Sequence, residues 1–169
     1  MSEPFKLTAE QKKLLRRTML GKLVSDDCEL FFQHVERTQL DPFKRQIYAQ
    51  ARWNKHLQRD TLSTQTSIDG FRIIAQRSGK YAGQCGPFWC GKDGKWLKDA
   101  DGHPMPWLSS DYPSAAMVGV LRVGFQGPLF RISRWDSFVQ RTKEGEVAQF
   151  WHQMPDIMLA KTAEAQALR

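Results

Sequence analysis

Hydrophobic positions recur at helical spacing in the first forty residues. Leu7, Leu14 and Leu15 fall on one side of a helix predicted over 7–23, and the pair Thr8 and Gln11 fits a capping box at its start. A second helix is predicted over 26–38, where two aspartates in its first turn favour the start of a helix. The sequence Asp41-Pro42 then ends the helical pattern.

The hydrophobic period changes from helical to alternating after residue 46. Residues 47–53 alternate apolar and polar side chains, and the threonine-rich residues 61–67 form the expected return strand after a polar loop. A short helix follows over 69–78, capped at Ser67 and ended by Gly79.

The second half of the chain predicts further hairpins and a long final helix. Strands are expected at 84–90, 95–98, 115–124 and 128–134, and helices at 135–140 and from Pro155 to the last residue. The expected fold class is α+β: a small antiparallel sheet of hairpins packed with a long C-terminal helix and two N-terminal helices. The final helix has no C-cap before the sequence stops, which favours a truncated chain.

Composition narrows the class of protein. The 169 residues carry 25 Lys and Arg against 18 Asp and Glu, a formal net charge of +7. The excess is concentrated in residues 1–22 and 44–80, which predicts a polyanionic partner. No apolar run is long enough for a membrane span, no secretory signal is recognisable, and three cysteines are too few for a disulfide framework. These features favour a cytosolic protein without membrane association.

Three enzyme or metal chemistries have partial signatures. Residues 86–92 fit most of a phosphate-binding P-loop, but Asp93 replaces the required Ser or Thr, and a hairpin turn is expected where the motif needs a helix. Asp69, Asp93 and Lys95 resemble the acidic and basic residues of a metal-dependent nuclease, although Asp69 equally suits a helix start. Cys85, Cys90 and His103 are thinly spaced for zinc, so no cofactor or metal is expected.

Basic side chains around the first hairpin are better candidates. Lys44 and Arg45 enter the strand, and Arg52 lies on its polar face. Lys55 and Arg59 occupy the hairpin loop, and Arg72 and Arg77 lie on the exposed faces of the next helix. In the last helix, Lys161 falls in line with Ile157 and Leu168, and Arg169 lies two turns further on, about 12 Å away. The two cations suit a groove floor that meets phosphates, whereas pairing of Lys161 with Glu164 is the structural alternative. Trp151 suits either a stacked base or the core.

An ordered set of motifs resembles a known family. The segment Leu40-Asp-Pro-Phe-Lys-Arg-Gln-Ile-Tyr48 is similar to its L-N-P-x-x-[KR]-x-I-Y motif. Ile68-Asp-Gly-Phe-Arg72, Gly79–Gly83, Gly86–Cys90 and Trp151–Arg169 follow in the same order. The chain resembles the phage recombination protein Bet (Red beta) group within the RecT superfamily of single-strand annealing proteins.

The resemblance implies ATP-independent binding and annealing of single-stranded DNA, through an annealed duplex intermediate, by a homo-oligomeric ring or helical filament in the bacterial host cytosol. It implies DNA contacts at Arg45, Trp151, Lys161 and Arg169. Residues 41–169 would form the annealing core. The two amphipathic helices expected in residues 1–40 are a separate reason to expect subunit contacts there. Family members continue beyond a core of this length into a region that docks a partner exonuclease or host single-strand-binding protein, and we expect that region to be absent here. Asp41 stands where the family motif has Asn, and Asp156 and Ile157 replace a Lys-Arg pair.

The residues themselves leave three functions open: an annealing protein, a metal-dependent nuclease, and an RNA-binding or structural phage protein.

Overall fold

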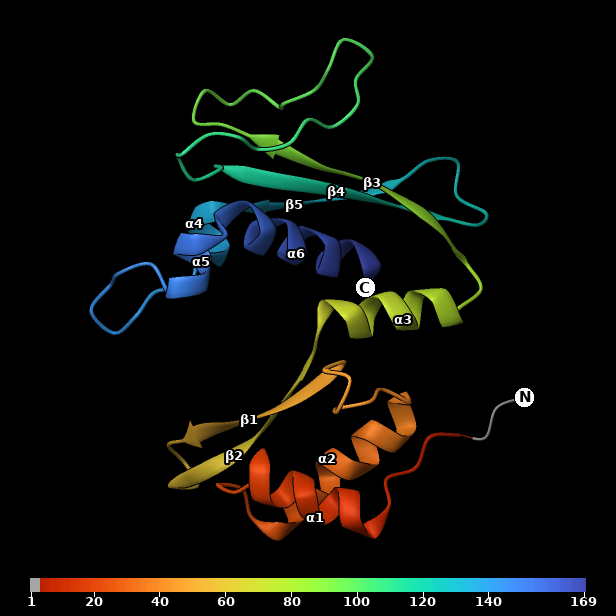
Figure 1. Cartoon of the computed structure of the whole chain (residues 1–169), viewed down its shortest axis with the longest axis vertical. Helices are drawn as coiled ribbons and strands as arrows, with labels where there is room; N and C mark the ends of the chain where they lie inside the picture. Colours follow the sequence, from red (N-terminus) through yellow and green to blue (C-terminus); the bar gives the residue numbers. More distant parts are fainter. Residues whose placement is uncertain (1–3) are drawn as a thin grey trace. The chain divides into compact units, whose positions relative to one another are not determined.

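The computed structural model describes residues 4–169. The chain divides into two compact units, of which the first extends to Ile73 and the second covers Ile74–Arg169 (Figure 1). The boundary between the units lies inside helix α3 (Ile68–Arg77), well beyond the division predicted at residue 40. The reason is that Leu40 and Ile47 share one buried core with the N-terminal helices. The functional division at residue 40 stays a prediction. Residues 1–3 of the predicted N-terminal region lie outside the described part of the chain.

Two helices and one hairpin build the first unit. Helix α1 (Ala9–Thr18) begins with the predicted capping box, in which Thr8 and Gln11 each bond the other's backbone N–H. Helix α2 (Ser25–Thr38) packs against strands β1 (Ile47–Asn54) and β2 (Arg59–Thr66). The strands pair antiparallel from Ile47 with Thr66 to Asn54 with Arg59, so the hairpin is confirmed. The fully buried side chains of this core include Leu15, Phe31, Phe32, Val35 and Leu40.

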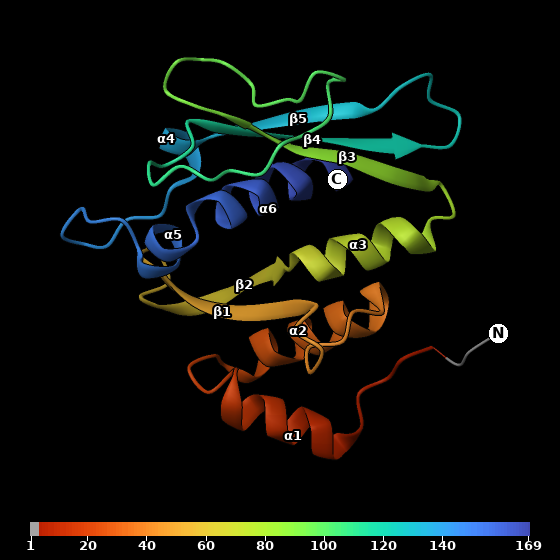
Figure 2. The same cartoon turned by 45° about the horizontal axis from the view of Figure 1, so that its top comes forward.

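A three-stranded antiparallel sheet and the final helix form the second unit. Strands β3 (Tyr81–Cys90), β4 (Ala115–Arg122) and β5 (Leu129–Arg134) lie in that order. Helix α6 (Pro155–Leu168) lies along one face of this sheet in both views (Figure 2). Its small and apolar residues allow close packing on the inward side chains of β4; the joint core includes Ala116, Val118, Val120, Leu159, Ala163 and Ala167.

One polar bond fixes the register between α6 and the sheet. Gln166 in α6 donates from its side-chain amide to the hydroxyl of Ser133 in β5, at 2.7 Å. Ser133 is fully buried, so this bond satisfies a polar atom that would otherwise be costly to bury.

Two short segments differ from the prediction. Residues 95–98 are not a strand: after the turn at Gly94 they form only isolated bridges, because Trp96 pairs with β3 whereas Lys98 pairs with Pro104. Helix α5 (Gln149–Gln153) was not predicted, since five residues are too few to show a helical period. Helix α4 (Trp135–Phe138) begins where expected.

The α+β fold class is therefore confirmed, with two small antiparallel sheets in place of one. Across residues 4–169, no helix combines the length and apolar character needed to cross a bilayer.

Candidate nucleic-acid interface

A tight turn presents the first two candidate cations. The carboxylate of Asp41 accepts the backbone N–H groups of Phe43 (2.8 Å) and Lys44 (3.3 Å). The side-chain oxygen of Gln46 accepts the N–H of Asp41 at 2.9 Å, and the backbone N–H of Gln46 donates to the carbonyl of Asp41 at 3.1 Å. Gln46 is only 8% exposed, so it closes the turn from inside while Lys44 and Arg45 face solvent.

Arg45 adopts a left-handed backbone conformation, with φ of 58°. This conformation costs a residue with a Cβ on the order of 1–2 kcal/mol. Such strain is typical of functional positions, where the surrounding structure over-determines the backbone. The turn therefore holds an arginine at a position where glycine would be less strained.

The carbonyl of Gln46 also anchors helix α3. It accepts the backbone N–H of Ser67 at 3.0 Å and the hydroxyl of Ser67 at 3.2 Å. Ser67 in turn accepts the N–H of Gly70, which confirms it as the helix cap. Gly70 lies so close that a Cβ added there would be 2.3 Å from the Gln46 oxygen. The two sequence motifs, 40–48 and 68–72, thus pack directly against each other in the first unit.

The candidate cations of this unit differ in their partners. Arg72 lies 3.2 Å from the carboxylate of Asp69, with both side chains exposed. Lys44, Arg45, Arg52 and Lys55 are exposed and make no ion pair within the described residues. Of these cations only Arg52 lies in β1; Lys44 and Arg45 precede the strand and Lys55 follows it, so the cations lie near the two ends of a strand about 23 Å long. That length equals roughly seven phosphates of a B-form strand.

The second unit carries Arg77, Lys161 and Arg169, all exposed. Lys161 does not lie in an apolar stripe as predicted. The buried side of α6 is formed by Leu159, Ala163 and Ala167, so Lys161 and Ile157 lie on its exposed side. Helix α6 ends at Leu168, so Arg169 follows directly after it.

Trp151 lies in the core, with 2% of its surface exposed. Its ring meets Trp135 edge-on at 5.6 Å, and Trp135 stacks on Tyr112 at 4.4 Å. Its indole nitrogen is buried without a hydrogen-bond partner in the described structure. A base cannot stack on Trp151 in this arrangement, so the predicted contact does not fit its position, and its visible role is to support α6.

The partial enzyme signatures do not assemble into catalytic geometry. Residues 86–90 belong to strand β3, and the N–H of Gly94 bonds to the carbonyl of Gly91 in a turn, so no helix start follows Lys92. The carboxylate of Asp93 accepts the N–H of Lys95 within the same turn. Asp69 pairs with Arg72 in α3. The two candidate carboxylates, Asp69 and Asp93, are thus each occupied by a local bond.

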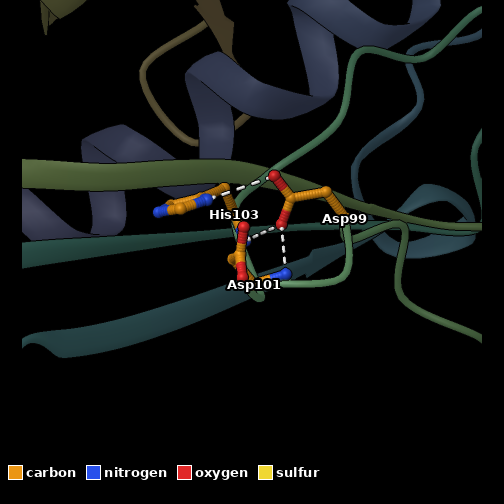
Figure 3. A group of neighbouring side chains, drawn as sticks. All are labelled: Asp99, Asp101 and His103. Atoms are coloured by element: carbon orange, nitrogen blue, oxygen red, sulfur yellow. Dashed lines mark hydrogen bonds and ion pairs between the residues drawn. The ribbon is translucent and has the colours of Figure 1, made fainter.

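One group of metal-ligating side chains occurs in the loop after β3. Asp99, Asp101 and His103 offer three ligand atoms within 4.8 Å of one another, all exposed (Figure 3). One oxygen of Asp99 accepts the N–H groups of Asp101 and His103, and the other lies 3.1 Å from the imidazole of His103. The N–H of His103 lowers the pKa of the Asp99 carboxyl below its ordinary value. These bonds explain the cluster as a loop-closing device; neither Cys85 nor Cys90 belongs to it.

The sequence model of the RecT family matches residues 5–169. The chain belongs to the RecT family. No curated protein sequence matches the chain. RecT proteins act in recombination as single-strand annealing proteins, so an interface built from basic side chains is the expected feature of this RecT chain.

Sequence reasoning missed several exposed side chains of this RecT protein. Trp53 is 60% exposed near the end of the hairpin, beside Arg52. Its place in an alternating apolar pattern predicted an inward side chain, because the pattern does not show how far the helices cover the strand. Lys80 and Arg122 lie beside Phe125 at one end of the second unit. The local sequence carries no signal for that grouping, which depends on how β3 and β4 pair.

Proposed function

We propose that the chain binds single-stranded DNA through its exposed basic side chains and anneals it to a complementary strand without ATP. The observation that carries the proposal is the set of exposed, unpaired cations at the two ends of β1: Lys44 and Arg45 in the turn before it, and Arg52 and Lys55 at its far end. The RecT match over residues 5–169 supports the same function. The first motif and the Ile68–Arg72 segment further favour the Bet group.

The physical mechanism needs no bond to be made or broken. Lysine and arginine side chains neutralise phosphates and release counterions, independently of base sequence. Two strands held on one basic surface repel each other less, and their base edges remain free to pair. Base pairing then selects the complementary strand, and its free energy drives annealing. No helix begins directly after Lys92, so residues 86–92 do not form the phosphate cradle of a P-loop.

We also propose the family's assembly into a homo-oligomeric ring or filament, acting in the bacterial cytosol. Many weak base pairs form along such an assembly before the two strands make a stable duplex.

Charge reversal tests the site. The double substitution Arg45→Glu and Lys55→Glu should weaken binding of a labelled dT oligonucleotide and lower the salt dependence of log K by about 1.4, at roughly 0.7 per lost phosphate contact. The control is Lys143→Glu, an exposed lysine in a polar loop. A double variant with the affinity and salt dependence of the parent protein would show that the basic hairpin is not the DNA site.

A further inference from the structure

A basic cavity at one end of the second unit has no role so far. Its volume is about 250 Å³, and every residue that lines it belongs to that unit. Its walls come from the end of α3, the start of β3, the end of β4, the turn that follows, the start of β5 and the last residues of α6. The lining includes the basic side chains Lys80, Arg122 and Arg169 and no aspartate or glutamate.

The turn after β4 holds an aromatic ring at this cavity. The N–H of Phe125 bonds to the carbonyl of Arg122 at 3.0 Å, and Gly124 between them has a φ of 89°. The N–H of Val123 bonds to the carbonyl of Lys80 at 2.8 Å, which ties the turn to the start of β3. These bonds fix the turn from both sides, although the ring of Phe125 is 53% exposed.

Arg122 and Phe125 make a cation–π contact. The guanidinium carbon of Arg122 is 5.7 Å from the centre of the Phe125 ring. Arg122 and Lys80 make no ion pair within the described residues. Aromatic faces and arginine planes are the groups on which unpaired bases stack, and nearby lysines contact the adjoining phosphates. The cavity is smaller than the usual pocket for a drug-sized ligand, so it suits one planar base rather than a larger cofactor.

We propose that this cavity binds one unpaired base of single-stranded DNA, stacked against Phe125, with Lys80 and Arg122 on the flanking phosphates. The proposal rests on the proposed function and adds a determinant of specificity. A base inside the cavity cannot pair at the same time. The cavity therefore recognises an unpaired base, while the neighbouring bases of the strand stay free to pair.

The test separates base contacts from phosphate contacts. Binding of a dT oligonucleotide is compared with binding of an abasic oligonucleotide of equal length, which keeps the phosphates and lacks the bases. The wild-type chain should bind the dT oligonucleotide about 5- to 150-fold more tightly, as expected for one stacked base. Phe125→Ala should reduce this ratio several-fold, whereas Phe125→Tyr, which keeps the ring, should preserve it.

Phe150→Ala serves as the matched control, because Phe150 is a similarly exposed phenylalanine (62%) of the same unit, in α5. It should leave the ratio unchanged. A Phe125→Ala protein that keeps the wild-type ratio overturns the proposal, and an accompanying change in oligomer size would assign this surface to contacts between copies. A wild-type chain that binds neither oligonucleotide overturns the proposed function itself.

Discussion

Alanine at position 70 tests the packing that joins the two motifs of the first unit. The added Cβ would lie 2.3 Å from the carbonyl oxygen of Gln46 and 2.8 Å from the Cγ2 of Thr66. Roughly 1 Å of movement is needed to restore ordinary contact, and the obstacle is backbone rather than a flexible side chain. Helix α3 must therefore move away from the turn that carries Arg45.

The cost follows from three contributions. Overpacking of this kind costs about 1–3 kcal/mol. Movement also weakens the two bonds from Ser67 to the Gln46 carbonyl, at about 1 kcal/mol each. Alanine returns about 1 kcal/mol through its higher helix propensity than glycine. We therefore expect Gly70→Ala to lower the free energy of unfolding by about 2–4 kcal/mol.

Urea unfolding followed by circular dichroism measures this loss, and hydrogen exchange at the Ser67 amide localises it. Gly21→Ala is the control within the same unit, because its Cβ would meet its nearest neighbour at an ordinary 3.7 Å. That control should change stability by less than about 0.5 kcal/mol. If Gly70→Ala is equally neutral, the close contact between the two motifs is not present in solution.

Three further predictions concern the second unit. Gly119→Ala should destabilise the protein by about 1–3 kcal/mol, because its Cβ would lie 2.4 Å from the sulfur of Cys85; adding Cys85→Ala should recover part of the loss in a urea melt. Trp151→Ala should cost about 3–5 kcal/mol as a core truncation, while Trp151→Phe should lose less and keep DNA affinity, since the indole N–H has no partner in the described structure; loss of affinity without loss of stability would instead indicate a DNA contact. The Asp99 carboxyl, whose pKa is lowered by the N–H of His103, should titrate below its ordinary range by NMR. Its contribution to stability is then present above the unfolded-state pKa and disappears as pH falls through the folded-state value, and Asp99→Asn should abolish that acid transition.

Much of the fold follows from local signals. The capping box at Thr8, the alternation of 47–53 and the proline at position 155 each specify an element through its own residues, and the structure confirms all three. Two hairpins and three long helices were therefore predictable. The strand expected at 95–98 does not form, because a strand needs a neighbouring strand to pair with, and the local sequence does not show whether one is present.

The candidate site was less predictable because it depends on long-range packing. The sequence showed that Lys44 and Arg45 are basic, but only the structure shows the closed turn and the positive φ at Arg45. The aromatic Trp151 could equally have been core or ligand contact, and its burial against Trp135 decides for the core in this structure. The cavity at Phe125 needs the pairing of β3 with β4 and the ends of α3 and α6, which are segments far apart in sequence.

Annealing of two complementary labelled oligonucleotides, with EDTA present and ATP absent, is the direct test of the proposed annealing function. Energy transfer between the labels reports pairing, and a denaturing gel reports whether the strands stay intact. We expect the chain to accelerate annealing at low salt, to lose this effect at high salt and to leave both strands whole. No acceleration at any salt concentration, or loss of labelled strand only when Mg²⁺ is supplied, would contradict it.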